Sequence, residues 1–150
     1  MIRTKNGQAL TQLILEIFRI NGELLSAGNR MTKPFGLTSA RWQVLGAIDE
    51  EGKALTVSQI SRRMGLARQG VQRIINELNK IGLVKSMPNI DHKRAPLFSL
   101  SDKGEKTMAK INEAQAAWVN NLSDSLSAKQ LDQSLDLLQS IRELSENLGH

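Results

Sequence analysis

The segment 55–83 carries apolar positions at the spacing of two short helices separated by a glycine turn. Thr56 and Gln59 have the spacing of a capping box, so the first helix should begin near residue 57, and Gly65 should end it. The second helix should bury the face that carries Val71, Ile74, Ile75 and Leu78, and should end at Gly82. The pattern therefore predicts a helix-turn-helix.

The outward face of the second helix carries side chains of the kinds that read DNA bases. Arginine donates in pairs to guanine, and glutamine or asparagine pairs with adenine, in a major groove that is wide enough to admit a helix. A solvated helix face would show the same pattern, because charged outer faces are common, and the helix alone does not separate the two interpretations. The candidate DNA contacts are Arg68, Gln69, Gln72, Arg73 and Asn76, with Thr56 at the start of the first helix.

A short β-hairpin with a basic tip is expected after the second helix. Residues 83–84 open an apolar strand, 86–96 form a polar loop, and 97–100 form the return strand. A basic hairpin directly after a recognition-type helix is the order of a winged helix-turn-helix, in which the wing reaches the DNA backbone or the minor groove. We therefore assign Arg94 to the minor groove and Lys93 to a phosphate, the alternative being that both only keep the loop tip soluble.

These segments resemble the multiple antibiotic resistance regulator (MarR) family of bacterial transcription factors. The resemblance rests on LTVSQISRRMGLARQGVQRIINELNKIGLV, on the wing IDHKRAPLFSLSDKG, and on LTSARWQVLGAI at 37–48, which is similar to the second helix of the family. It covers nearly the whole chain and implies one domain at 1–150. Within it, 37–100 would form the DNA-binding core, and 1–36 and 101–150 would form dimerisation helices.

Two positions depart from the pattern of the family. Ala67 stands where members often have a serine that caps the recognition helix, so this cap must come from elsewhere or be absent. Asp91 lies three residues before Arg94, whereas the family often places an aspartate two residues before that arginine, and here His92 takes that place. A wing-bracing role therefore does not carry over to Asp91.

The outer segments have the pattern of association helices. Apolar residues between Ala9 and Leu25 are too many for one narrow stripe, which indicates burial on more than one side. Near the other end, Ser127 and Gln130 form a second capping-box pair, and leucines follow at helical spacing. A monomeric helical bundle is the alternative, but two heads spaced one DNA turn apart would read a palindrome, which favours a homodimer. The expected fold is mainly α, with a small β-hairpin wing and long terminal dimerisation helices.

Charge and composition agree with a DNA-binding head. Residues 53–106 hold eleven basic and four acidic side chains, a net charge of +7, whereas the two flanks together carry −2. A membrane surface would also attract such a patch, but no amphipathic helix with a bulky apolar face lies beside it, and no membrane span is expected. The chain has no cysteine, which fits a reducing, cytoplasmic compartment and excludes thiol-based sensing.

A small effector is a further expectation that the resemblance implies. Members of the family commonly bind phenolic or lipophilic ligands where the dimerisation helices meet the winged-helix head. Large aromatic side chains also dominate core packing in any fold, so core packing is the alternative role for each aromatic candidate. The candidate ligand contacts are Phe18, Phe35, Trp42 and Trp118.

Catalytic chemistry has little support in the sequence. The two histidines are His92 in the expected wing and His150 at the end of the chain, and neither belongs to a metal-ligand pattern. Glycine-rich phosphate loops and nucleophile elbows are also missing, so no enzymatic activity, metal or cofactor is expected. The sequence thus favours a homodimeric, sequence-specific DNA-binding regulator, most simply a ligand-responsive repressor of a palindromic operator. The alternative is a winged-helix dimer that acts as a protein-protein interaction module.

Overall fold

The computed structural model describes residues 2–149, which fall into two compact units with the boundary between Asn112 and Glu113. The helices are α1 (Lys5–Thr32), the short 3-10 helix η1 (Lys33–Phe35), α2 (Ser39–Glu51), α3 (Val57–Met64), α4 (Arg68–Lys80), α5 (Asp102–Ser123) and α6 (Ala128–Leu148). A hairpin of β1 (Val84–Met87) and β2 (Leu97–Leu100) lies between α4 and α5. The mainly helical fold with one small hairpin is thus confirmed.

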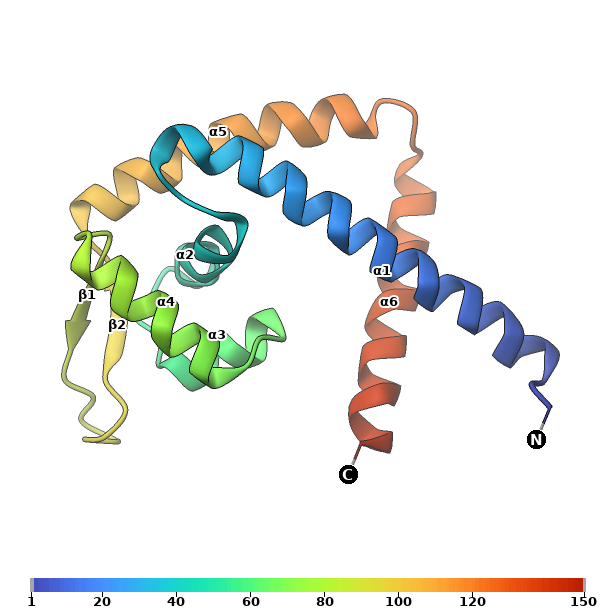
Figure 1. Ribbon diagram of the computed structural model, residues 1–150, viewed down its shortest axis with the longest axis horizontal. Helices are drawn as coiled ribbons and strands as arrows, with labels where there is room; N and C mark the ends of the chain where they lie inside the picture. Colours follow the sequence, from blue (N-terminus) through green and yellow to red (C-terminus); the bar gives the residue numbers. More distant parts are fainter. Residues whose placement is uncertain (1, 150) are drawn as a thin grey trace. The chain divides into compact units, whose positions relative to one another are not determined.

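Within the first unit, α2, α3 and α4 gather beside the hairpin and form a small head (Figure 1). Its core draws apolar side chains from these helices, from both strands and from the start of α5. The most deeply buried large side chains include Val44, Leu45, Ile60, Val71, Ile75, Leu78, Met108 and Ile111. Burial of this kind is the main favourable contribution to folding, so the head has a core of its own.

The boundaries of the two central helices follow the local signals of the sequence. The Thr56 side chain accepts from the backbone N–H of Gln59, and the Gln59 side chain accepts from the backbone N–H of Thr56, which completes the expected capping box. Gly65 ends α3 with φ 62°, a left-handed conformation that glycine adopts without strain. The second helix, α4, ends two residues before the expected Gly82, which has φ 78°.

The wing is anchored to the head by a strand pairing that the sequence pattern did not indicate. β1 and β2 pair antiparallel, with Val84 opposite Leu100 and Met87 opposite Leu97. In addition, Leu55 forms an isolated bridge with Phe98 through backbone hydrogen bonds of 2.9 and 2.8 Å. The residue directly before the capping box thereby joins the edge of the hairpin, and the start of α3 is fixed relative to the wing.

A close approach joins the end of α4 to the start of α5. A Cβ built on Gly104 would lie 2.0 Å from the carbonyl oxygen of Leu83, so only glycine fits there. Ser101 supports the junction, because its hydroxyl donates to the carbonyl of Gly82 and accepts from the backbone N–H of Gly104. Lys103 Nζ adds a 3.0 Å hydrogen bond to the carbonyl of Ile81. The long helix α5 is therefore held directly against the turn that ends α4.

The long helices α1 and α6 expose many apolar side chains. On α1 these include Leu10, Ile14, Leu15, Phe18, Ile20 and Leu24, and on α6 Leu131, Leu135, Leu137, Leu138, Leu144 and Leu148. Ser127 and Gln130 form the expected capping box at the start of α6. Over the described part of the chain, every helix is too short or too polar to cross a membrane.

Candidate nucleic-acid interface

The turn between α3 and α4 has a fixed conformation. The backbone N–H of Leu66 donates to the carbonyl of Ser61 at 3.1 Å, and the hydroxyl of Ser61 donates to the carbonyl of Leu66. Ala67 occupies the N-cap position of α4 and provides no side-chain cap. The departure from the family pattern at this position therefore leaves the start of α4 without a side-chain cap.

The helix α4 divides into a buried face and an exposed polar face, as its periodicity predicts. Val71, Ile74, Ile75 and Leu78 are at most 7% exposed. The opposite side chains are all exposed, and they are Arg68, Gln69, Gln72, Arg73 and Asn76. A partner that approaches this face of α4 from solvent therefore meets the candidate base-reading residues.

Most of the candidate DNA contacts line one open groove. Arg68, Gln69 and Gln72 of α4 share this groove with Thr56 at the start of α3 and with Arg94 from the wing. Val57, Ser58, Ala95 and Pro96 complete the lining. Two helices and the wing, which are separated in sequence, thus present donors and acceptors to the same space.

Three further candidates lie outside the lining of this groove. Arg73 is exposed on α4, and Lys93 is exposed at the wing tip. Asn76 Oδ1 accepts a 2.9 Å hydrogen bond from Gln72 Nε2, and this bond orients the amide of Gln72. The Oε1 atom of Gln72 has no hydrogen-bond partner among residues 2–149. The structure therefore gathers five of the eight candidates and leaves the other three on the surfaces beside them.

The wing loop is braced by Asn89, a residue that the sequence pattern did not single out. Asn89 Nδ2 donates to the carbonyl of Ala95 at 2.9 Å, and Asn89 Oδ1 accepts from the backbone N–H of Asp91 at 3.2 Å. The Asp91 carboxylate itself is exposed and has no hydrogen bond within the described residues. The sequence signal for this role was an asparagine at the start of a turn-rich loop, because asparagine side chains often accept a hydrogen bond from the backbone two residues later and form an Asx turn.

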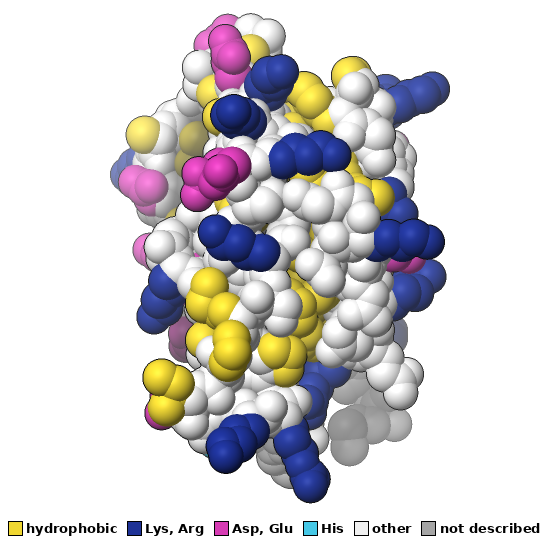
Figure 2. Space-filling model, turned by 90° about the vertical axis from the view of Figure 1, so that its left-hand side faces the viewer, with side chains coloured by type: hydrophobic (Ala, Val, Ile, Leu, Met, Phe, Trp, Pro, Cys, Tyr) yellow, Lys and Arg dark blue, Asp and Glu magenta, His cyan; other side chains and the backbone are white. Residues whose placement is uncertain are grey.

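The electrostatics of the head favour an anionic partner. Among the described residues, the side chains of Arg68, Arg73, Lys93 and Arg94 form no ion pair with an acidic group. Lys and Arg side chains are spread over the side of the molecule on which the hairpin lies, and they outnumber the acidic side chains among them (Figure 2). Unpaired surface cations of this density create a positive field that attracts polyanions.

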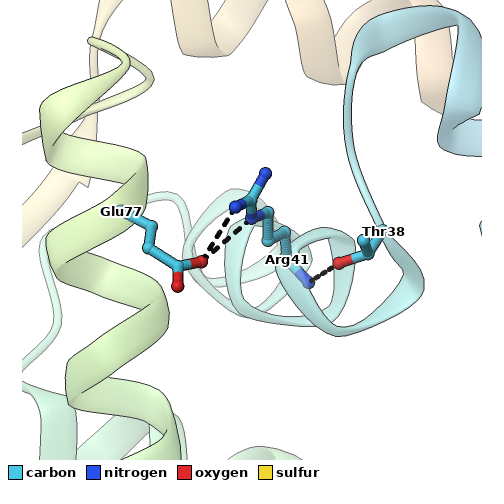
Figure 3. A network of polar contacts seen from close by, with 3 residues as sticks. All are labelled: Thr38, Arg41 and Glu77. Carbon is cyan, nitrogen blue, oxygen red and sulfur yellow. Dashed lines mark hydrogen bonds and ion pairs between the residues drawn. The ribbon is translucent and has the colours of Figure 1, made fainter.

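Other basic side chains of the head are engaged with carboxylates. Lys53 lies 3.1 Å from Glu51 and Arg63 also contacts that carboxylate, so α3 is joined to the end of α2. The hydrogen bond from Lys53, together with Arg63, holds the pKa of Glu51 below its usual value. Arg41 of α2 binds Glu77 of α4, with Nε 3.1 Å and Nη2 3.0 Å from the same carboxylate oxygen (Figure 3).

The four candidate ligand contacts have different surroundings. Phe35 lines a hollow with Lys103, Lys106, Thr107 and Lys110 of α5. Trp42 packs against the core of the head, whereas Phe18 is 68% exposed on α1. Trp118 belongs to the second unit and is half-buried. Within residues 2–149, no group of three His, Cys, Asp or Glu side chains could hold a metal ion.

A helix-turn-helix followed by a basic hairpin defines this protein as a winged helix-turn-helix protein. The model of the MarR family matches residues 35–95, from the end of η1 through the wing loop. An uncharacterised protein of Mycobacterium tuberculosis strain H37Rv is 35% identical over 130 residues, which cover 87% of this chain and 90% of that protein. The chain belongs to the MarR family of transcription regulators.

Two further similarities agree with this assignment. The transcriptional repressor MprA of Escherichia coli strain K12 is 26% identical over 125 residues, covering 83% of this chain and 69% of MprA. A mutant MarR from E. coli, complexed with operator DNA, has the same fold at a TM-score of 0.76 and 20% identity, covering 89% of this chain and 95% of that one. The chain is thus a DNA-binding regulator by family, and this family consists of regulators rather than enzymes.

Proposed function

We propose that this protein is a repressor that binds a palindromic operator as a homodimer. The observation that carries the proposal is the groove in which Arg68, Gln69 and Gln72 of α4 face the same space as Thr56 and Arg94. In such an arrangement α4 reads base edges in the major groove, and the wing reaches the adjacent backbone or minor groove. Arg73 and Asn76 extend the reading face, and Lys93 contacts a phosphate.

The repressor role draws its support from relatives. The MarR of E. coli named above was solved with operator DNA, and MprA is named a transcriptional repressor. Because a dimer covering a promoter excludes polymerase, repression is the simplest consequence of operator binding. Expression of a reporter gene placed behind the operator should therefore rise when the gene for the protein is deleted, and should fall when that gene is restored.

The homodimer is supported by the apolar surfaces of α1 and α6. Phe18 is 68% exposed and Leu135 is 55% exposed, and each belongs to a row of exposed apolar side chains. Contiguous apolar surface of this kind marks an interaction site, because its burial is favourable by roughly 25 cal/mol per Å². A second copy with the same helices supplies the matching surface and sets the spacing of the two heads.

The effector of the proposed repressor is a small aromatic molecule, and the hollow beside Phe35 is the site that best fits it. Phe35 supplies an aromatic ring to the lining, and Lys106 and Lys110 are exposed cations of the same lining. This combination suits an aromatic ring that carries an acidic group. Phe18, Trp42 and Trp118 stay in the proposal as contacts that a dimer would add.

Reciprocal titrations test the effector. A ligand that controls DNA binding must weaken operator affinity by the same factor by which the operator weakens ligand affinity, with a coupling of about 1–3 kcal/mol. Calorimetric titration of benzoate or salicylate, with and without operator, measures the change in ligand affinity, and titration of operator with and without the ligand measures the change in operator affinity. Equal ligand affinity in the two titrations would show that the ligand does not regulate.

DNA binding itself is tested by footprinting and by salt dependence. Genome-wide footprinting should identify a palindromic site whose affinity falls steeply with salt, yet stays about 10³-fold or more above the affinity for random DNA. A winged-helix dimer that serves only as a protein-binding module would show the same weak, salt-sensitive affinity on every sequence. That result would contradict the proposed function.

A further inference from the structure

Glu77 is the only acidic residue of the recognition helix α4. It follows Arg73 by four residues, the spacing at which oppositely charged side chains pair on a helix surface. An Arg73–Glu77 pair would occupy a candidate base-reading side chain and would place a negative charge close to DNA phosphates. Among residues 2–149, however, Arg73 has no ion pair, and Glu77 binds Arg41 instead.

The geometry shows how Arg41 holds Glu77. Glu77 extends from α4 toward α2, where Nε and Nη2 of Arg41 lie 3.1 and 3.0 Å from its Oε2 (Figure 3). The two side chains are only 29% and 39% exposed, so solvent screens this pair less than a fully exposed pair. Thr38 caps the start of α2 by accepting from the backbone N–H of Arg41 at 3.3 Å, which fixes the backbone from which the guanidinium extends.

We propose that Arg41 is a positioning residue for DNA recognition, because it holds Glu77 and thereby leaves Arg73 free to contact DNA. The same pair neutralises the one negative charge on α4. This inference rests on the proposed function, since it assigns a role to a residue that stands outside the DNA-facing groove. It differs from a purely structural role, in which the Arg41–Glu77 pair would only hold α4 against α2.

A rescue experiment separates these two roles. The affinity of the full-length protein is measured for duplex DNA that the wild-type protein enriches from a random-sequence pool. Arg41→Ala should weaken this affinity about fivefold, because Glu77 then pairs with Arg73 in both copies of the dimer and repels phosphates. In the double variant Arg41→Ala/Glu77→Gln, affinity should return to within about twofold of the wild type, since removal of the carboxylate frees Arg73 again.

Matched controls and a stability measurement complete the design. Glu50 is exposed on α2 and lies outside the Arg41–Glu77 pair, so Arg41→Ala/Glu50→Gln removes a negative charge elsewhere on the head and should not restore affinity. Thermal unfolding of every variant shows which of them are folded. Arg41→Gln, which keeps a longer side chain, replaces Arg41→Ala in the same cycle if the alanine variant does not fold.

Two results would overturn the inference. If Arg41→Ala binds as tightly as the wild type, Arg73 does not need protection from Glu77. If affinity is lost and Glu77→Gln does not restore it, Arg41 acts directly on DNA or only holds the helix. A failure of the proposed function looks different, because the wild-type protein would then enrich no sequence from the pool at all.

Discussion

Each side chain of α4 belongs either to the DNA-facing surface or to the core, and alanine substitutions distinguish a role in DNA binding from a role in stability. Arg73→Ala should leave the protein folded, because the side chain is exposed and forms no ion pair within the described residues. It should weaken specific operator binding by about 1–3 kcal/mol, the usual contribution of a bidentate arginine. Fluorescence anisotropy against the operator and a random duplex measures this loss. Unchanged operator affinity in a folded variant would contradict the role given to Arg73.

Leu78, on the opposite face of the same helix, should behave in the reverse way. Its side chain is fully buried in the core of the head. Leu78→Ala should lower the free energy of unfolding by about 2–5 kcal/mol, because it removes buried methyl groups and leaves a cavity. Urea denaturation provides the measurement, and a loss below about 1 kcal/mol would show that α4 is not packed as described.

The two basic residues of the wing tip should differ from each other. Lys93→Ala should lower affinity on all sequences and reduce the magnitude of the salt slope by about 0.9 for each subunit contact, as expected for a phosphate contact. Arg94→Ala should reduce affinity more on A/T-rich flanks than on G/C-rich ones, because a narrow minor groove attracts the guanidinium. Titrations over a range of salt concentrations on both kinds of flank distinguish the two variants. Identical behaviour would indicate that the wing provides only general positive charge.

Between whole elements, contacts decide how the wing and α5 are held to the head. The bridge between Leu55 and Phe98 joins the start of α3 to the hairpin, and Asn89 braces the loop that carries Lys93 and Arg94. These contacts connect segments that are far apart in the sequence. A local pattern of residues therefore predicts the strands and helices themselves but not the bonds between them.

The junction of α4 and α5 yields a prediction at this scale. Gly104→Ala should lower the free energy of unfolding by about 1–3 kcal/mol, because the new Cβ would lie 2.0 Å from the carbonyl oxygen of Leu83 and force the backbone to move. Gly46→Ala is the matched control within α2, where a Cβ meets nothing within 4 Å. It should raise stability by about 0.5–1 kcal/mol, since alanine favours a helix. Equal effects of the two substitutions in urea denaturation would refute the close approach.

At the scale of the whole molecule, the exposed apolar rows of α1 and α6 indicate that one chain leaves its burial incomplete. Leu135→Lys should shift the protein toward monomers and weaken the dimer about tenfold or more, because each copy loses the burial of one leucine. Ser140→Lys adds the same charge at an exposed polar position on a different side of α6 from Leu135, and should leave the dimer intact. Sedimentation equilibrium measures both variants. A dimer that is insensitive to Leu135→Lys would show that α6 does not form the interface.

Local signals in the sequence predict the elements of the head and the face that each of them buries. The capping box at Thr56, the glycines at 65 and 82, and the 3.6-residue spacing from Val71 to Leu78 are local signals, because caps, turns and helix faces depend on residues only a few positions apart. The same locality made the exposed face of α4 predictable. The wing hairpin and the outer helices were predicted in the same way, from short apolar runs, turn residues and the second capping box at Ser127.

Contacts between side chains of different elements, in contrast, became visible only in the folded structure. It brought Thr56 and Arg94 to the groove beside α4, while Arg73, Asn76 and Lys93 remained outside its lining. It also paired Arg41 with Glu77, a contact between residues 36 positions apart that no spacing rule describes. Such contacts depend on how the helices pack around the core, because packing sets the distance between side chains that the chain itself keeps far apart.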